Sequence, residues 1–218
     1  MPHRRAIFFD IDGTLVDSNR LHVEAWVEAF AEAGHEIDRE RIAGQIGKGA
    51  DNLVPELIPG ADEKTAETLG DAHGRIFKNR YLDRVRPFPQ ARALVERAHA
   101  AGRLVALASS ASEEELKHYC TLLDLADLVD VATTIDDVGN SKPAPDIFSV
   151  ALKKAGLDAA DVIVVGDSPF DMQAAAKAGM AAVAVRSGGF SDDALTGAVA
   201  IYDDASALLA GFDASPLA

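Results

Sequence analysis

Residues 6–17 of the chain, AIFFDIDGTLVD, decide its fold. Four consecutive apolar residues, Ala6 to Phe9, are followed at once by two aspartates, Asp10 and Asp12. A short apolar run without alternation is typical of a strand that is buried on both faces, as in a parallel sheet. Such sheets bind ligands at the carboxyl ends of their strands. The stretch therefore predicts a buried parallel strand that presents carboxylates to a binding site.

Further apolar runs of the same kind recur along the chain. They comprise residues 104–108, 129–135, 162–165, 180–185 and 198–202. Helix-start signals lie between them, namely Ser112 before three glutamates, Pro145, and Ser168 before a proline. Strands that alternate with helices predict an α/β fold with a Rossmann-like parallel sheet and helices on both of its faces.

The interval 16–86 breaks this alternation. It contains no convincing strand, but apolar residues recur at helical spacing from Leu21 to Ala33, and another helix is predicted from about Glu63 to Leu82. We therefore predict an α/β core formed by residues 1–15 and 87–218, with an inserted α-helical cap formed by residues 16–86. A cap that is joined by two linkers can open and close as a lid.

The charge balance limits the partners that the chain can have. Asp and Glu total 35 against 21 Lys and Arg, which gives a formal charge of −14. This charge repels phosphate backbones and anionic lipids, so neither nucleic acid nor a membrane surface is expected as a partner. The single cysteine, Cys120, cannot form an internal disulfide. We expect a soluble cytoplasmic protein, and both a monomer and a homodimer remain open.

Polar residues follow the predicted strands where a parallel sheet would gather them. They are Asp10, Asp12, Ser109, Lys142, Asp167 and Asp171. Converging carboxylates repel one another unless a divalent cation lies among them, and Mg²⁺ prefers oxygen ligands. A lysine and a hydroxyl add a positive charge and a donor that suit a phosphate. The set predicts a site for phosphate and metal, with a carboxylate available for covalent chemistry.

Four segments resemble the motifs of the haloacid dehalogenase-like hydrolases. Residues 8–17, FFDIDGTLVD, resemble the DxDGTLxDS signature, and residues 107–110, LASS, resemble the second motif. Residues 141–146, SKPAPD, resemble the third motif, and residues 165–171, VGDSPFD, match the fourth, GDxxxD. The motifs occur in the family's order and cover nearly the whole chain. The helical insertion is similar to the cap of the subfamily that includes phosphoglycolate phosphatase and β-phosphoglucomutase.

The resemblance implies catalytic roles for four of the residues. Asp10 would be the nucleophile that forms an aspartyl-phosphate. Asp12 would protonate the leaving group and then activate the water that hydrolyses the intermediate. Ser109 and Lys142 would bind the phosphoryl oxygens, and Lys142 would also offset the charge near Asp10.

The resemblance also implies a magnesium site. Mg²⁺ would be held by Asp10, by the backbone carbonyl of Asp12 and by Asp167. Asp171 would support the site from outside the direct ligands. A capping box with Ser168 would also explain an acid at position 171, and the two roles can coexist.

Two cap residues carry weaker signals. His22 stands at the offset from Asp12 where some relatives carry a cap histidine that faces the site. It also shares a helix face with Trp26 and Phe30, so simple packing explains it equally well. Lys48, in the turn of residues 47–51, either contacts the leaving group or is a solvated loop lysine.

The departures from the family's patterns select among its reactions. Dehalogenases lack the second aspartate, so Asp12 argues against that class. The mutases typically carry a lysine just past the second motif, where this chain has Ser112 and Glu113. We therefore expect an enzyme, a Mg²⁺-dependent phosphatase acting on a small phosphomonoester. A β-phosphoglucomutase-like phosphomutase and a non-catalytic binding or regulatory module are the alternatives. The substrate stays open among a sugar phosphate, phosphoglycolate and a nucleotide monophosphate.

Overall fold

A parallel sheet forms the centre of the molecule. The computed structural model describes residues 5–218, so the first residues of the predicted core, 1–4, lie outside the described residues. In this described part the main sheet has six strands. They are β1 (Ala6–Phe9), β4 (Leu104–Ala108), β5 (Val131–Thr133), β6 (Val162–Gly166), β7 (Ala181–Val185) and β8 (Ala200–Tyr202). Each pairs in parallel with its neighbours, in the order β5-β4-β1-β6-β7-β8. The predicted Rossmann-like sheet is confirmed, and β1 lies at its centre.

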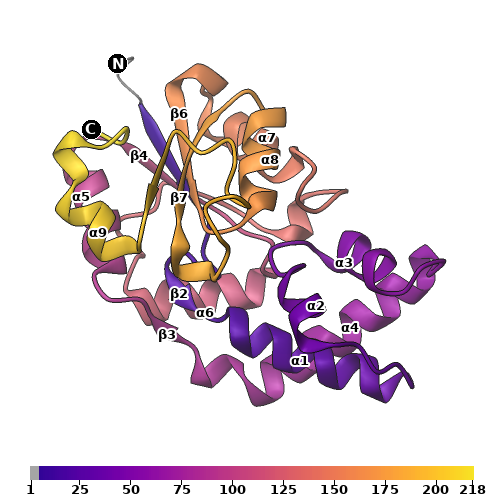
Figure 1. Cartoon of the computed structure of the whole chain (residues 1–218). Coiled ribbons are helices and arrows are strands. Elements are labelled where there is room, and N and C mark those ends of the chain that lie inside the picture. Colours follow the sequence, from indigo (N-terminus) through magenta and orange to yellow (C-terminus); the bar gives the residue numbers. More distant parts are fainter. Residues whose placement is uncertain (1–4) are drawn as a thin grey trace.

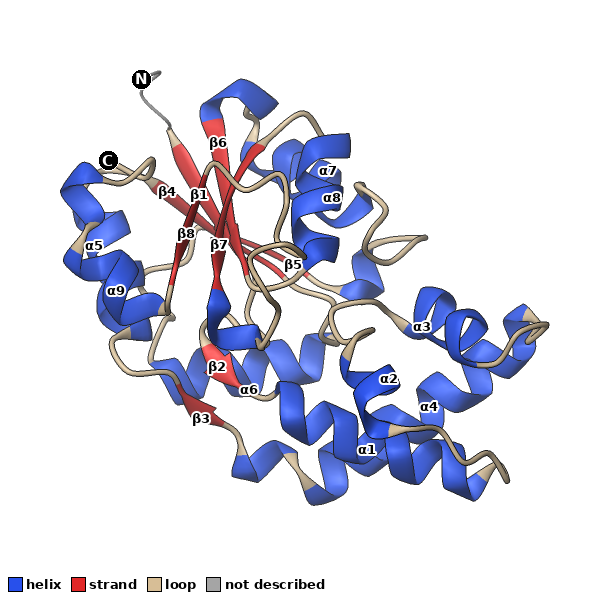
Figure 2. Cartoon of the chain, viewed as in Figure 1, coloured by secondary structure: helices blue, strands red, loops and turns tan. Residues whose placement is uncertain are grey.

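Helices cover both faces of this sheet, as Figures 1 and 2 show. One face packs against α5 (Ala91–Ala100), α6 (Glu113–Leu123) and α9 (Ala205–Ala210). The opposite face packs against α7 (Asp146–Ala155) and α8 (Pro169–Lys177). Ile7 and Phe9 of β1 join the first cluster of buried side chains, whereas Ala6 and Phe8 join the second. Successive strand residues point to opposite faces, which is why the strand sequences are apolar throughout.

The helix starts follow from local sequence. Ser112 and Glu115 form a capping box at the start of α6, and Ser168 and Asp171 form another at the start of α8. Each box satisfies backbone N–H groups that the first helical turn leaves without partners. Short 3₁₀ helices also occur in the connections between these elements and after α9. They are Leu82–Arg84, Ile135–Asp137, Ala159–Asp161, Arg186–Gly188 and Phe212–Ala214.

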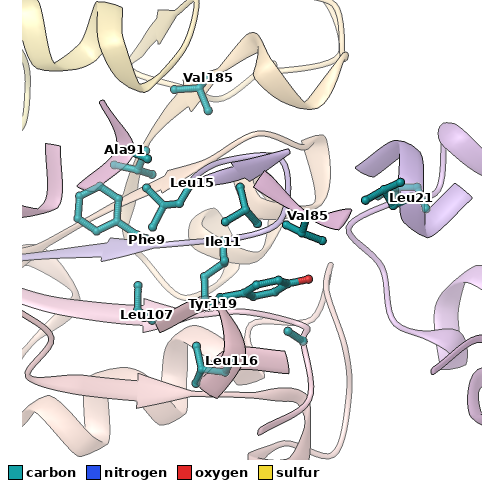
Figure 3. Close-up of a cluster of buried hydrophobic side chains, with 14 of the residues drawn as sticks. Phe9, Ile11, Leu15, Leu21, Val85, Ala91, Leu107, Leu116, Tyr119 and Val185 are labelled. Carbon is teal, nitrogen blue, oxygen red and sulfur yellow. The ribbon is translucent and has the colours of Figure 1, made fainter. Parts of the chain in front are cut away.

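The inserted interval is helical, as predicted from its periodicity. It contains α1 (Asn19–Glu32), α2 (Arg39–Ala43), α3 (Ala50–Leu57) and α4 (Glu63–Arg80). Figure 1 shows them grouped apart from the main sheet. Their buried side chains are nevertheless continuous with the cluster on the α5–α6–α9 face of the sheet. Figure 3 shows part of this cluster around Phe9, Ile11 and Tyr119. Within residues 5–218 none of the helices is both long and apolar enough to cross a membrane.

The sequence analysis found no strand in this interval, and that expectation is wrong at its two ends. β2 (Val16–Asp17) and β3 (Arg86–Pro87) form an antiparallel pair where the chain leaves the core and returns to it. The backbone N–H of Phe88 also donates to the carbonyl of Leu15 at 2.9 Å. Strands of two residues are too short to show a periodic pattern. The division into a core and a cap at these positions stays a prediction.

Candidate active site

The carboxyl ends of the central strands gather three carboxylates. Asp10 follows β1 directly, Asp167 follows β6, and Asp171 lies in the first turn of α8. Oxygen atoms of these side chains lie within 4.8 Å of one another, and all three residues are buried. They meet because β1 and β6 are parallel neighbours and end at the same edge of the sheet.

Lys142 lies between two of these carboxylates. Its Nζ is 2.6 Å from Oδ1 of Asp10 and 2.7 Å from Oδ1 of Asp171, and its side chain is 1% exposed. Burial by itself would lower the pKa of Lys142, but the charges of Asp10 and Asp171 outweigh it and raise that pKa. The lysine is therefore a fixed positive charge beside Asp10.

One lysine does not balance three buried carboxylates. Burial raises the pKa of Asp10 to about 7, although Lys142 acts to lower it. Burial, followed by the charges of Asp171 and Asp10, also raises the pKa of Asp167 well above its usual range. These shifts show that the site disfavours full ionisation without a further cation. The donor set consists of carboxylate oxygens, which fit Mg²⁺.

Asp167 is held tightly by residues that the sequence analysis did not identify. Nδ2 of Asn19 donates to its Oδ2 at 2.9 Å, and Oγ1 of Thr14 donates to its Oδ1 at 3.2 Å. A Cβ atom on Gly188 would lie 1.8 Å from the same Oδ2. Thr14 belongs to the first motif, but no pattern links Asn19 or Gly188 to Asp167.

Asp171 forms the capping box and also faces the carboxylate cluster, while its role in a metal site stays a prediction. Its Oδ2 accepts hydrogen bonds from the backbone N–H and the Oγ–H of Ser168, at 3.1 and 2.5 Å. Its Oδ1 lies at the ammonium group of Lys142 instead. One oxygen therefore caps α8 while the other faces the cluster.

Asp12 points away from the carboxylate cluster and toward the inserted helices. Its Oδ1 accepts a hydrogen bond from Oγ of Ser18 at 2.5 Å and lies 3.2 Å from Nε2 of His22. Burial acts to raise the pKa of Asp12, but the charge and hydrogen bond of His22 outweigh it and lower that pKa. Tyr119 is fully buried, and its hydroxyl lies near Asp12. Burial and then the nearby Asp12 raise the pKa of Tyr119.

A cavity of about 840 Å³ joins these groups to the inserted helices. Asp10, Asp12 and Lys142 line it, and so does Ser109, whose Oγ accepts a hydrogen bond from the backbone N–H of Ala111 at 3.1 Å. The inserted helices contribute further lining residues, which include His22, Trp26, Lys48 and His73. The structure thus brings every residue singled out from the sequence to the cavity or to the cluster beneath it.

Comparison with known proteins decides the family. A family model described as "Haloacid dehalogenase-like hydrolase" matches residues 7–185. The chain belongs to this family of hydrolases. The resemblance seen in the four motifs is confirmed, and so is the prediction of an enzyme.

Two relatives of this hydrolase are similar to it over most of their length. A phosphoglycolate phosphatase of Yersinia pseudotuberculosis is 33% identical, with 80% of this chain and 78% of that protein covered. The fructose-1-phosphate phosphatase YqaB of Escherichia coli is 28% identical, with 83% of this chain and 95% of that protein covered. The crystal structure of a hydrolase from Pseudomonas syringae superposes with a TM-score of 0.89 at 29% identity, over 97% of this chain and 99% of that chain.

In this hydrolase Lys48 is not a solvated loop lysine, so that alternative is wrong. Its side chain is only 12% exposed, and its Nζ donates to Oε1 of Gln45 at 2.6 Å. The same Nζ lies 4.8 Å from the ring centre of Phe170 and 3.8 Å from Oε2 of Glu56. Contact with a leaving group stays a prediction.

The start of α3 docks on the loop that carries Lys142. Oγ of Ser141 accepts hydrogen bonds from the backbone N–H of Gly49 and from Nδ2 of Asn52, both at 2.9 Å. In return, the backbone N–H of Ser141 donates to Oδ2 of Asp51 at 3.0 Å. The sequence analysis missed these contacts, because no local signal relates residues about 90 positions apart.

Proposed function

We propose that this hydrolase is a Mg²⁺-dependent phosphatase that hydrolyses a small phosphomonoester. The observation that carries the proposal is the buried Asp10 carboxylate, which lies against Lys142 and opens onto a cavity of about 840 Å³. A cavity of this size suits a small molecule. The names of the phosphoglycolate and fructose-1-phosphate phosphatases among its relatives support the same class of reaction.

Asp10 is the nucleophile of the proposed reaction. One of its carboxylate oxygens forms a bond to phosphorus while the bond from phosphorus to the leaving oxygen breaks. A carboxylate and a phosphate dianion repel each other, so the attack needs positive charge beside both groups. Lys142 supplies that charge at Oδ1 of Asp10. Ser109, which is fully buried at the end of β4, would donate its hydroxyl hydrogen to a phosphoryl oxygen.

Asp12 is the proposed general acid and base. It gives a proton to the leaving oxygen in the first step, so it has to be protonated when the substrate is bound, although His22 lowers its pKa in the free protein. In the second step it takes a proton from the water that attacks the aspartyl-phosphate, which releases phosphate and restores Asp10. The hydrogen bond from Ser18 and the contact with His22 hold its carboxylate away from the cluster of Asp10, Asp167 and Asp171.

The metal site of the proposal uses residues already described. Asp10, Asp167 and the backbone carbonyl of Asp12 would hold Mg²⁺, and Asp171 would support them from outside. When bound, Mg²⁺ supplies positive charge that polarises the phosphoryl group and offsets the excess of carboxylates. The raised pKa values of Asp10 and Asp167 support this assignment, because they indicate a site that favours another cation.

Residues 16–86 form a cap over the site in this proposal. α1 and α4 line the cavity through His22 and His73, and the start of α3 closes it near Ser141. A closed cap excludes water from the reacting groups. Substrates would then be selected by the part of the cavity that the cap provides.

The test is hydrolysis of p-nitrophenyl phosphate. We expect turnover with Mg²⁺, none with EDTA, and none for Asp10→Asn. Asp17→Asn is the matched control, because Asp17 is an exposed aspartate on β2, and it should behave as the wild type. A panel of natural phosphomonoesters should follow. Turnover that survives Asp10→Asn, or that persists in EDTA, would contradict the proposal.

A further inference from the structure

His73 lies directly behind the histidine that contacts Asp12. Its Nε2 is 3.3 Å from Nδ1 of His22, and Nε2 of His22 is 3.2 Å from Oδ1 of Asp12. The three side chains therefore form a continuous line from α4 through α1 to the end of β1. No motif in the sequence singles out His73.

Aromatic stacking fixes the orientation of both imidazole rings. His22 stacks on Phe77, with ring centres 3.8 Å apart and planes 10° apart. His73 stacks on Trp26, with ring centres 4.3 Å apart and planes 14° apart. Phe77 and Trp26 belong to the buried core, so neither support is free to move away. With the ring planes held, the nitrogen atoms of the two histidines face each other.

The protonation chemistry of His73 and His22 allows one ring to set the orientation of the other. Burial, and then the charge of His22, lower the pKa of His73 well below its usual range. A neutral imidazole has one N–H donor and one acceptor nitrogen. When His22 carries both ring protons, its Nδ1–H donates to Nε2 of His73. When His22 is neutral with its proton on Nε2, Nδ1 accepts instead from Nε2–H of His73. In both states Nε2–H of His22 is directed at Asp12.

We propose that His73 is a positioning residue for Asp12, which it controls through the tautomer and ring orientation of His22. The consequence for catalysis rests on the proposed function, in which Asp12 is the general acid. The hydrogen-bonded path from His73 to Asp12 runs through His22, and His73 itself also lines the cavity.

Two variants separate this role from simple packing. His73→Phe preserves an aromatic ring against Trp26 but removes the nitrogen that faces His22. His73→Gln preserves a polar atom near the position of Nε2 but removes the ring. Positioning predicts that Gln is tolerated better than Phe, and packing predicts the opposite order. His99→Phe, at an exposed position on α5, is the matched control and should leave all readouts unchanged.

The kinetic readout is kcat/KM for two esters. A p-nitrophenolate leaving group needs little protonation, whereas an alkoxide depends on the general acid. We expect His73→Phe to lower kcat/KM for an alkyl phosphate such as glycerol phosphate by about tenfold, a fraction of the ~10²–10⁴-fold that general acid–base catalysis contributes. The same variant should change p-nitrophenyl phosphate hydrolysis by less than about twofold, and His73→Gln should recover the alkyl ester. An equal loss on both esters would overturn the proposal.

Nitrogen NMR of the histidine rings tests the contact without turnover. We expect the ¹⁵N shifts of His22 to change in His73→Phe and to return toward the wild-type values in His73→Gln. Unchanged His22 shifts in His73→Phe would overturn the proposal, even if both esters are hydrolysed. If the wild-type enzyme hydrolyses neither ester, the proposed function fails, and the His22 shifts still decide whether His73 positions that ring.

Discussion

Replacing Lys142 with methionine should destabilise the metal-free protein strongly at neutral pH. The two side chains have similar length, so Lys142→Met removes the charge and leaves little empty volume. The change leaves Asp10 and Asp171 without the ammonium group that they share, in a buried cluster that also holds Asp167. Breaking a buried ion pair by removing one partner costs about 3–5 kcal/mol of the free energy of unfolding.

The pH dependence of this loss has a defined sign. In the folded protein Asp10 has a pKa of about 7, above its ordinary value of 3.8, so between these values the folded chain binds more protons than the unfolded chain. The stabilisation from that proton is present at low pH and disappears as the pH rises through 7. Without Lys142, which lowers the pKa of Asp10, the proton is held to higher pH. The deficit of Lys142→Met should therefore be largest above pH 7 and should shrink toward pH 5.

Thermal and urea unfolding in EDTA measure this effect. A loss of about 3–5 kcal/mol corresponds to a fall in Tm of roughly 6–20 °C for a chain of this size. Lys64→Met is the matched control, because Lys64 is exposed near the start of α4, and it should change Tm by little. An unchanged Tm for Lys142→Met at pH 8, or a deficit that grows as the pH falls to 5, would refute the reasoning.

Three further outcomes follow from the same geometry. In EDTA the contribution of Asp10 to the wild-type free energy of unfolding should fall by about 3 kcal/mol between pH 4 and 7, because its pKa is raised from 3.8 to about 7, and the raised pKa of Asp167 acts in the same direction. Saturating Mg²⁺ should flatten this pH dependence. Urea unfolding at several pH values measures it, and a free energy of unfolding that does not change with pH in EDTA would contradict the raised pKa values. Gly188→Ala should weaken Mg²⁺ binding by about 10–100-fold in calorimetry, because the new Cβ would lie 1.8 Å from Oδ2 of Asp167. A variant that binds Mg²⁺ as tightly as the wild type would contradict the clash between this Cβ and Asp167. Gly49→Ala should raise KM for a natural phosphomonoester about 3- to 10-fold, since its Cβ would lie 2.6 Å from Cβ of Ser141 and disturb a hydrogen bond; an unchanged KM would show that this contact does not matter for substrate binding.

Most of the fold could be predicted because its signals are local. Each strand of the main sheet is a short apolar run, and polar or small residues mark where most of these runs end. The start of α6 is marked by Ser112 and its end lies near Asp124, which adopts a left-handed conformation with φ of 51°. Such features depend on neighbours within a few residues, so periodicity and capping rules are sufficient to find them.

The missing parts of the site depend on distant residues. Asn19 precedes Asp167 by about 150 residues, and Gly188 follows it by 21 residues, yet both lie against its side chain. Nothing in the sequence around either residue indicates these contacts. His73 contacts His22 only because α1 and α4 pack side by side. Motifs placed the acids and the lysine at the strand ends. The residues that orient these acids, such as Asn19 and His73, come close to them only in the folded structure, so the sequence alone does not identify them.

The antiparallel pair of β2 and β3 has a consequence for how such enzymes diversify. Val16 pairs with Pro87 and Asp17 with Arg86, so the outgoing and returning chains lie one strand spacing apart, about 4.8 Å. A segment whose two ends are adjacent can be exchanged as a unit without changing the path of the remaining chain. The carboxylates, the lysine and the serine of the site all lie outside the exchanged unit. Exchanging the helical segment would therefore leave these residues in place, but the new segment would have to supply partners for Asp167 and Asp12, because Asn19, Ser18 and His22 lie inside the exchanged unit.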